Sequence, residues 1–346
     1  MKHQTTRYGE IPFYKIGTFG NTADAFISKK LFLEYKTKYS FPKKGDILIS
    51  ASGTIGRAVI YDGKPAYFQD SNIVWIDNDE TLVKNDFLFY AYSNVKWNTE
   101  HTTILRLYND NFRNTLIPLP PLNEQSAIAN ILSALDRYLY ALDALILKKE
   151  GVKKALSFEL LSQRKRLKGF NQTWQRVRLG DIANYLTSNL SAEQITQQGK
   201  IKVYDVNNFI GYTDTTFISD KPYISIVKDG SVGRVRILPP KTNILSTMGA
   251  LIANHRTTTE FLFYLLSNFD FKNFTSGSII PHIYFKDYKE KTIFLPPLNE
   301  QSAIANILSA LDNEITSLKN KKRQFENIKK ALNHDLMSTK IRVLKK

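Results

Sequence analysis

The residue types that carry most enzymatic chemistry are sparse in this chain. It has no cysteine, which excludes thiol nucleophiles, disulfides and thiolate metal sites. The five histidines are scattered, without the spacing that metal ligation needs. The sequence contains no Gly-x-x-x-x-Gly-Lys-Ser/Thr loop and no dinucleotide fingerprint. It therefore supplies neither a metal-ligand set nor a cradle for nucleotide phosphates.

Two activities on nucleic acids would need motifs that the chain does not offer. A methyltransferase acting on the amino group of a flipped base needs Asn/Asp-Pro-Pro-Tyr/Phe, but the proline pairs at 120–121 and 296–297 stand between leucines. Asp24 with Glu34 and Lys36 resembles a nuclease constellation, although short acidic patterns arise often by chance. We expect no catalytic residues, and turnover by the isolated chain would establish the alternative, an enzyme in one chain.

The charge of the chain indicates a polyanionic partner. Lys and Arg number 48 against 32 Asp and Glu, a net charge of +16, and the excess is spread along the chain. Such a distribution is typical of a protein that contacts nucleic acid over much of its surface. A merely Lys-rich composition is the alternative. Because no signal peptide and no apolar run long enough to cross a membrane is visible, we expect a cytoplasmic protein without a membrane partner.

Two Gly-rich turns that end in arginine could contact a nucleic acid. They read SGTIGR at 52–57 and DGSVGR at 229–234. The structural interpretation is a hairpin whose glycines supply positive φ. The functional interpretation is that backbone amides and the arginine approach a phosphate or a base edge. Both interpretations stay open at this point.

Two polar loops, at 101–106 and 275–282, are the other candidates for contacts. They are the variable, exposed kind of segment that carries recognition. Together with the two turns they predict a set of nucleic-acid-binding residues, which comprises Arg57, Arg106, Lys228, Arg234, Ser278 and His282.

The elements that must position these loops are organised by a perfect repeat. The eighteen letters LPPLNEQSAIANILSALD occur at 119–136 and again at 295–312, an offset of 176 residues (295 − 119). This period is too long for a solenoid and indicates a duplicated pair of domains. After each proline pair a helix is expected, with Asn123 and Asn299 as N-caps and Glu124 and Glu300 in the first turn, where a negative charge suits the helix dipole.

Apolar residues follow each repeat at heptad spacing, which indicates a coiled coil. We expect the first helix to run from about Asn123 to about Arg166 and the two helices to pack on each other in antiparallel orientation; packing of each helix on its own domain is the alternative. The predicted stripes include Ile131, Leu145, Val152 and Ile328. The residues predicted for the spacer and for partner docking are Leu135, Leu142, Leu156, Leu311, Leu318 and Phe325.

The segments between the helices predict two mixed α/β domains. In the first we expect strands at 9–17, 47–50, 58–61 and 67–76, a short helix near 22–32 and a helix at 86–92. The second has the same plan with different letters. The second domain begins with a longer stretch than the first, so we expect the first domain to lack a strand equivalent to Val177–Ile182. The sheet of the first domain would then have an unpaired edge or a borrowed strand. We expect the chain to divide into the segments 1–118, 119–170, 171–294 and 295–346. The expected fold class is α+β, with the two halves related by a pseudo-two-fold axis.

This pattern resembles the specificity (S) subunits of Type I restriction-modification systems. The resemblance covers essentially the whole chain. It is carried by the variable–shared–variable–shared layout, the two segments PLPPLNEQSAIANILSALD and FLPPLNEQSAIANILSALD, the opener WQRVRLGDIANY, the two Gly-rich turns and FTSGSIIPHI. The short start of the first domain is a departure from that pattern.

The resemblance implies a subunit without catalytic activity that binds double-stranded DNA. Two target-recognition domains would each bind one half of a bipartite site. The paired helices would set the separation of the half-sites and dock two methyltransferase (M) subunits, with translocating restriction (R) subunits as further partners. The resemblance implies no cofactor in this chain and S-adenosylmethionine in the methyltransferase subunits. A DNA-binding regulator acting alone is the alternative that co-purification with a methyltransferase would exclude.

Overall fold

The computed structural model describes residues 4–68, 72–97 and 106–344. It divides into two compact units, each of which is formed by segments distant in sequence. Unit 1 comprises residues 1–143 with 320–346, and unit 2 comprises residues 144–319. Each unit therefore contains one mixed α/β domain and one part of each long helix.

Unit 1 contains a small sheet with the strand order β2-β1-β5. Strand β1 is antiparallel to β2 and parallel to β5. Phe13 and Tyr67 stack across the parallel pair, with ring centroids 6.1 Å apart, and α1 adds Phe32 to the same apolar cluster. These elements are β1 (Ile11–Tyr14), β2 (Ala25–Ile27), α1 (Lys29–Lys38) and β5 (Tyr67–Phe68).

A second sheet of unit 1 carries the first Gly-rich turn. Its order is β4-β3-β6, with both pairs antiparallel. Strand β3 is buried along its length because Ile47 and Ile49 pack against Leu88 and Tyr92 of α2. The bounds are β3 (Ile47–Ser50), β4 (Ala58–Ile60), β6 (Ile73–Ile76), α2 (Asn85–Tyr92) and α3 (Asn109–Arg113).

Unit 2 has the same plan and further strands. Its sheets have the orders β10-β9-β13 and β12-β11-β14-β8, followed by the pairs β15–β16 and β17–β7. The strands are β7 (Gln175–Arg178), β8 (Ala183–Thr187), β9 (Ile201–Tyr204), β10 (Phe209–Thr213), β11 (Tyr223–Val227), β12 (Val235–Leu238), β13 (Thr242–Ile244), β14 (Met248–Ala253), β15 (Thr275–Ser276), β16 (His282–Ile283) and β17 (Thr292–Leu295). The helices are α5 (Thr259–Ser267) and α6 (Phe285–Tyr288).

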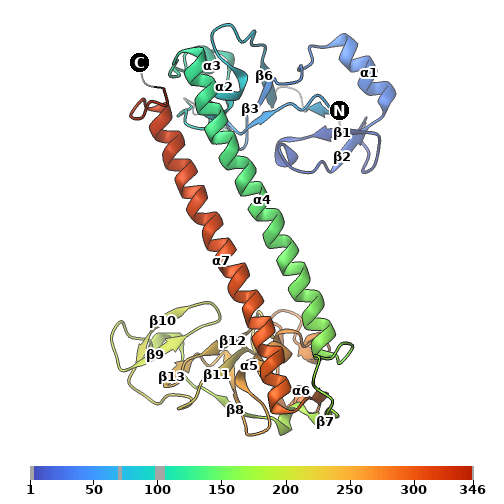
Figure 1. Ribbon diagram of the computed structural model, residues 1–346, viewed down its shortest axis with the longest axis vertical. Helices are drawn as coiled ribbons and strands as arrows, with labels where there is room; N and C mark the ends of the chain where they lie inside the picture. The colour runs from blue at the N-terminus through green and yellow to red at the C-terminus, as the bar shows by residue number, and fades with distance from the viewer. Residues whose placement is uncertain (1–3, 69–71, 98–105, 345–346) are drawn as a thin grey trace. The chain divides into compact units, whose positions relative to one another are not determined.

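Two helices of 40 residues, α4 (Leu122–Leu161) and α7 (Leu298–Met337), contribute to both units (Figure 1). In unit 1, α4 meets α7 through the ion pairs Asp136–Lys329 and Asp143–Lys322. In unit 2 the contacts include Lys149–Glu314 (2.8 Å) and Lys153–Asp312 (2.5 Å). Partner numbers fall along α7 as they rise along α4, so the helices pair in antiparallel orientation within each unit.

The apolar seam of the helix pair is narrower than the sequence predicts. Of the six predicted spacer residues, Leu142 is buried and the other five are half-buried. In contrast, Ile131, Leu145, Val152 and Ile328 are exposed, so assigning them to the seam was wrong. An α-helix of 3.6 residues per turn drifts relative to a seven-residue repeat, which turns these positions away from the neighbouring helix.

Three predicted boundaries are wrong. The segment near 22–32 contains β2, and α1 begins only after Ser28, whose side chain accepts a hydrogen bond from Leu31 N–H (3.2 Å). The expected strand 67–76 is two strands, with residues 69–71 outside the described part. Helix α4 ends at Leu161, two residues before Gln163 at φ +61°, rather than near residue 166.

The predicted N-caps are also wrong, since the long helices begin at Leu122 and Leu298. The Pro121 carbonyl accepts the first helical hydrogen bond, from Gln125 N–H (2.9 Å). Asn123 instead accepts from its neighbour Glu124. A proline at this position costs no helical hydrogen bond, because the first N–H groups of a helix have no partner within it. Glu124 and Glu300 do lie in the first turn, as predicted.

The predicted fold class, α+β with two similar domains and a pair of long antiparallel helices, is confirmed. Within the described residues, no helix has the length and apolar character needed to cross a membrane.

Candidate functional site

The glycines of the first Gly-rich turn are required by its geometry. Gly53 and Gly56 have φ of +70° and +80°, where a side chain is strained. A Cβ on Gly56 would lie only 2.2 Å from the Trp97 ring nitrogen. The Ser50 hydroxyl accepts a hydrogen bond from the Arg57 N–H (3.0 Å) and closes the turn. The structural interpretation therefore explains the glycines and leaves the arginine side chain to be explained.

Arg57 and Arg106, two of the predicted residues, are attached to this same turn. Arg57 is exposed and donates from Nη1 to the Phe19 carbonyl (3.0 Å). Arg106 forms a β-bridge with Ser52, and the Ser52 hydroxyl donates to Asn72 Oδ1 (2.8 Å). The rest of the predicted loop, residues 101–105, lies outside the described residues.

The second Gly-rich turn in unit 2 has the same backbone. Gly230 and Gly233 have φ of +83° and +79°, and a Cβ on Gly233 would meet the Phe271 ring at 2.6 Å. Asp229, at the position of Ser52, forms the equivalent β-bridge to His282, at the position of Arg106. The Asp229 carboxylate and His282 Nδ1 are 2.6 Å apart. The same frame therefore presents a Ser–Arg pair in unit 1 and an Asp–His pair in unit 2.

Basic side chains gather beside the second turn. Arg234 donates from Nη2 to Asn207 Oδ1 (3.0 Å), and Arg236 donates from Nη1 to the Asn207 carbonyl (2.9 Å). The Arg236 guanidinium also lies 5.3 Å from the centre of the Tyr204 ring. Lys228 is half-buried at the end of β11, where its carbonyl accepts from the Ile283 N–H (2.9 Å). The sequence did not indicate Asn207 or Arg236 as candidates, because only the fold places the β9–β10 connection against the turn.

The hairpin β15–β16 brings the remaining two predicted residues to the second turn. Ser278 is exposed in the connection between the two strands, and His282 begins β16. Next to Ser278, the Ile279 side chain is 92% exposed. An apolar side chain at a loop tip can contact a thymine methyl group or enter between base steps. Ile279 was missed because an isoleucine in a sequence is normally a core residue.

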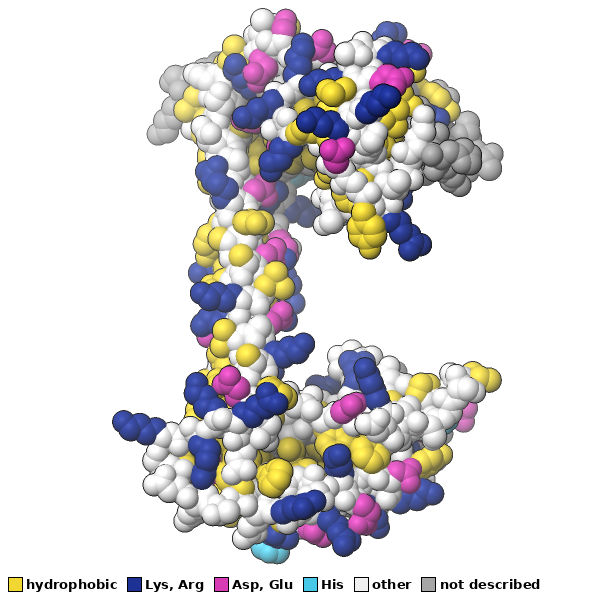
Figure 2. Space-filling view, turned by 90° about the vertical axis from the view of Figure 1, so that its right-hand side faces the viewer, with side chains coloured by type: hydrophobic (Ala, Val, Ile, Leu, Met, Phe, Trp, Pro, Cys, Tyr) yellow, Lys and Arg dark blue, Asp and Glu magenta, His cyan; other side chains and the backbone are white. Residues whose placement is uncertain are grey.

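On the face drawn in Figure 2, the Lys and Arg side chains of the described residues do not form one dense patch. They are distributed among Asp and Glu side chains over each domain. This agrees with the spread-out excess of the sequence. Such a surface favours many phosphate contacts rather than one anion site. Among the residues that the structure describes, no group of three or more His, Asp and Glu side chains is arranged to hold a metal ion.

The repeated Leu-Asn-Glu-Gln segment attaches each long helix to its domain. Gln301 is fully buried: its Nε2 donates to the Arg256 carbonyl (2.9 Å), and its Oε1 accepts from the Thr258 N–H (3.0 Å). Gln125 repeats this in unit 1, with the Leu82 carbonyl and the Lys84 N–H. The sequence alone did not indicate this role for the glutamines.

The glutamate of the same segment is paired with an arginine that follows the other long helix. In unit 2, Arg166 Nη2 lies 2.6 Å from Glu300 Oε2, and the Trp174 indole donates to the same oxygen (3.0 Å). In unit 1, Arg342 Nη2 lies 2.8 Å from Glu124 Oε2. The hydrogen bond from Arg342 holds the pKa of Glu124 below its ordinary value. The repeat offset makes Arg166 and Arg342 equivalent.

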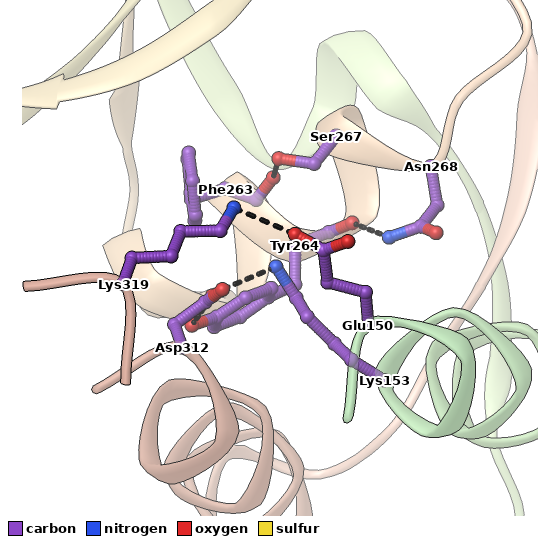
Figure 3. Close-up of polar contacts among 8 residues, drawn as sticks. All are labelled: Glu150, Lys153, Phe263, Tyr264, Ser267, Asn268, Asp312 and Lys319. Atoms are coloured by element: carbon purple, nitrogen blue, oxygen red, sulfur yellow. Dashed lines mark hydrogen bonds and ion pairs between the residues drawn. The ribbon is translucent and has the colours of Figure 1, made fainter. Parts of the chain in front are cut away.

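The last residue of each repeat joins three elements, as Figure 3 shows for unit 2. Tyr264 of α5 donates to Asp312 Oδ2 (2.9 Å), while Lys153 of α4 pairs with Asp312 Oδ1 (2.5 Å). The Lys153 ammonium also lies 5.8 Å from the centre of the Tyr264 ring. Burial, followed by the hydrogen bond to Asp312, raises the pKa of Tyr264. Tyr90, Asp136 and Lys329 form the same network in unit 1.

Comparison with known proteins identifies the same family along most of the chain. The model of the Type I restriction modification DNA specificity domain matches twice, over residues 1–149 and 171–327. Over 133 residues the chain is 65% identical to a Haemophilus influenzae protein named as a type I restriction enzyme specificity subunit, a stretch that is 38% of this chain and 34% of that relative. It is 25% identical over 362 residues to the Type I restriction enzyme MjaVIII specificity subunit of Methanocaldococcus jannaschii, covering 92% and 84%.

Solved structures share the fold. The crystal structure of a Type I restriction-modification S subunit from M. genitalium has a TM-score of 0.64 at 21% identity, covering 97% of this chain and 91% of that one. A structure concerned with assembly and conformational transition of the type I R-M system has a TM-score of 0.55 at 17% identity, covering 85% and 82%. At these identities the likeness carries the fold alone.

Proposed function

The chain belongs to the family of Type I restriction–modification DNA specificity subunits, and on this premise we propose that it directs a methyltransferase complex to a bipartite site on double-stranded DNA. Each recognition domain reads one half-site. The chain itself performs no chemistry, and S-adenosylmethionine belongs to the partner M subunits. The complex acts in the cytoplasm, and restriction subunits join it as further partners.

One observation carries the proposal. The two units hold the same turn on the same strands but present different side chains beside it: Ser52 with Arg106 in unit 1, and Asp229 with His282 in unit 2. A shared frame with exchanged polar groups is what two modules need to recognise different base sequences. Phosphate contacts from the distributed basic surface supply affinity, and the groups at the turns supply discrimination.

The helices supply a surface for the methyltransferase subunits. The predicted docking residues, such as Leu142, are buried or half-buried in the helix pair and serve the spacer. The exposed apolar side chains of α4 are better candidates for docking: Tyr140 in unit 1, and Leu147 and Phe158 in unit 2. Aromatic and leucine side chains that would stand in water alone become favourable when a partner covers them.

The test is to co-express the chain with its methyltransferase in a host without DNA methylation and to map N6-methyladenine over the genome. We expect methylation at a bipartite motif with a fixed gap. Arg234→Ala should relax recognition at one half-site only, with a loss of about 1–3 kcal/mol of discrimination if the arginine makes a bidentate base contact. Loss of specificity in both half-sites at once would contradict the modular proposal.

The matched control is Lys221→Ala. This exposed lysine lies in the same unit, just before β11, while Arg234 lies beyond the other end of that strand. Its loss should leave the motif unchanged. A soluble chain that neither co-purifies with the methyltransferase nor directs methylation would favour a DNA-binding protein acting alone.

A further inference from the structure

A cavity of about 630 Å³ lies in unit 1 between its two sheets. Tyr14 of β1 and Phe68 of β5 line it on one side, and Val59 of β4 lines it on the other. A volume of this size is ordinary for a site that binds a small molecule. The residues predicted to contact DNA are not among those that line it, and the proposed function does not use it.

The wall that the first sheet contributes is aromatic. Tyr14 and Phe68 stack on the parallel strands β1 and β5, with ring centroids 5.8 Å apart and ring planes at 16°. Tyr61, which follows β4, meets Phe68 edge-on. Phe68 and Tyr61 are buried and Tyr14 is half-buried, so Tyr14 is the ring with surface to offer a ligand. The face of such a ring attracts cations.

The cavity has a filled counterpart in unit 2. Tyr204 is equivalent to Tyr14, because each ends the middle strand of its sheet and pairs there with the last residue of a parallel strand, Ile244 or Phe68. The guanidinium carbon of Arg236 lies 5.3 Å from the centre of the Tyr204 ring. Unit 2 therefore provides this tyrosine with a cation from its own chain.

Unit 1 has a short aliphatic side chain at the position of Arg236. Val59 pairs with Leu48 of β3 and Arg236 pairs with Ser225 of β11, and these partners each stand five residues before the first glycine of their turn. The valine ends at its Cγ atoms, so it lines the cavity without crossing it. The space that unit 2 closes with a guanidinium is open in unit 1.

The charge beside the tyrosine differs in the same sense. Glu10 and Pro12 lie on the same face of the chain as Tyr14, because side chains alternate along a strand, and all three line the cavity. At the positions equivalent to 10 and 12, unit 2 has Lys200 and Lys202. Unit 2 thus surrounds its tyrosine with cations, whereas the same positions of unit 1 hold a carboxylate and no cation.

Glu10 is the carboxylate that is left for a ligand. Its Oε2 accepts a hydrogen bond from the Lys29 backbone N–H (3.1 Å), and no Lys or Arg side chain in the described part of the chain forms an ion pair with it. Asp62 also lines the cavity, but it already pairs with Lys64 (3.4 Å). A carboxylate without a cation beside an open aromatic face is a combination that suits an organic cation.

We propose that this cavity binds a small alkylguanidinium ligand. Its guanidinium lies over the Tyr14 ring, as that of Arg236 lies over Tyr204, and pairs with Glu10. Its alkyl part packs against Val59 in the space that the longer arginine side chain fills in unit 2. The inference does not rest on the proposed recognition of DNA.

The probe is butylguanidinium, measured by equilibrium dialysis against the full-length protein. We expect one molecule bound per chain. A chain with a net charge of +16 repels cations in general, so binding would report a local site. Butylurea, which has the same shape without the charge, should bind on the order of tenfold more weakly because it loses the cation–π contact and the ion pair. No binding of butylguanidinium, or equal binding of butylurea, would overturn the proposal.

A second ligand separates a small molecule from a protein side chain. Arginine blocked as the N-acetyl methylamide carries the same guanidinium on a peptide backbone. We expect it to bind no more tightly than butylguanidinium. Clearly tighter binding would assign the cavity to an arginine of another protein and overturn the small-molecule proposal.

Variants of the protein locate the site. Glu10→Lys gives unit 1 the charge that Lys200 has in unit 2 and should abolish binding. The matched control is Glu34→Lys, the same change at an exposed glutamate of α1 that does not line the cavity, and it should leave binding unchanged. An equal loss in the control would reduce the effect to net charge and refute the inference.

A second variant fills the cavity from within. Val59→Arg should place a guanidinium over Tyr14, as Arg236 does over Tyr204, and should also abolish binding, while an unchanged melting temperature shows that the variant folds. Because Glu10 is exposed, Glu10→Lys tests the site even where Val59→Arg disturbs the core. Binding that survives Glu10→Lys, or that survives in a folded Val59→Arg protein, would place the ligand elsewhere and refute the inference.

Discussion

Units 1 and 2 share eighteen identical residues, yet the same residues are held differently. Glu300 accepts from Arg166 and from the Trp174 indole and is fully buried, whereas Glu124 pairs with Arg342, whose side chain is half exposed. Position 136 of the first repeat and position 312 of the second make the same contacts to Tyr and Lys. The contacts that the repeats make with the long helices are therefore the same in both units, whereas the contacts that they make with the start of each domain differ.

The largest effect should follow removal of the glutamate. Glu300→Ala leaves the Arg166 guanidinium and the Trp174 indole without their acceptor and should cost about 3–5 kcal/mol of stability. Glu124→Ala should cost less, because Arg342 can return to water. Urea unfolding of each variant, followed by hydrogen exchange at the start of α7 or of α4, measures both losses. Equal losses would mean that the units are not different in this respect.

An intermediate effect is expected at the tyrosines that join α2 and α5 to the repeats. Tyr264→Phe removes the hydrogen bond to Asp312 and should cost about 1.5 kcal/mol at neutral pH. The pKa of Tyr264 is raised in the folded state, so the neutral tyrosine stabilises it. This stability is fully present below the ordinary tyrosine pKa of about 10 and declines as the pH rises from there towards the folded value.

The pH dependence separates this tyrosine from a purely packing role. Tyr264→Phe should make the alkaline decline in unfolding free energy shallower, and Tyr90→Phe should do the same because its pKa is raised by the same causes. A decline of unchanged slope in both variants would exclude the tyrosines as its source.

The smallest effect concerns one position where the units use different chemistry. Lys149 pairs with Glu314 in unit 2, and the equivalent residues of unit 1 are Phe325 and Tyr138, whose ring centroids are 4.7 Å apart. Lys149→Ala should cost about 0.5 kcal/mol or less, and the loss should shrink at high salt. Phe325→Leu should cost about 1 kcal/mol irrespective of salt. Melting curves at low and high salt distinguish the two, and a salt-dependent loss for Phe325→Leu would contradict the assignment.

The regular parts of the fold were predictable from the sequence. Proline pairs followed by Leu-Asn-Glu-Gln predicted the helix starts to within one or two residues, because proline limits its own geometry and that of its neighbours. The Gly-rich turns were predicted because only glycine occupies their positive φ without strain. The helix at 86–92 followed from its apolar content, and it is α2.

The misses have a common physical cause. The segment near 22–32 has a helical composition, but pairing with β1 makes Ala25–Ile27 a strand. Ile131 and Ile328 are apolar but exposed, since burial depends on which side of the helix faces a neighbour. Asn207 and Ile279 entered the candidate site only through tertiary placement, because the sequence does not say which loops meet.

The sequence by itself determined the duplication, the two long helices, the distributed positive charge and the absence of cysteine chemistry. These properties depend on amino-acid composition and on local backbone preference. Identical sequences have the same composition and the same preference wherever they occur in the chain. The tertiary structure alone decided that Leu295 is covered and Leu119 is not, and that Glu300 holds an indole while Glu124 lines a cavity. Burial is decided by partners distant in the chain: Trp174 lies 126 residues from Glu300, a separation across which no local pattern acts.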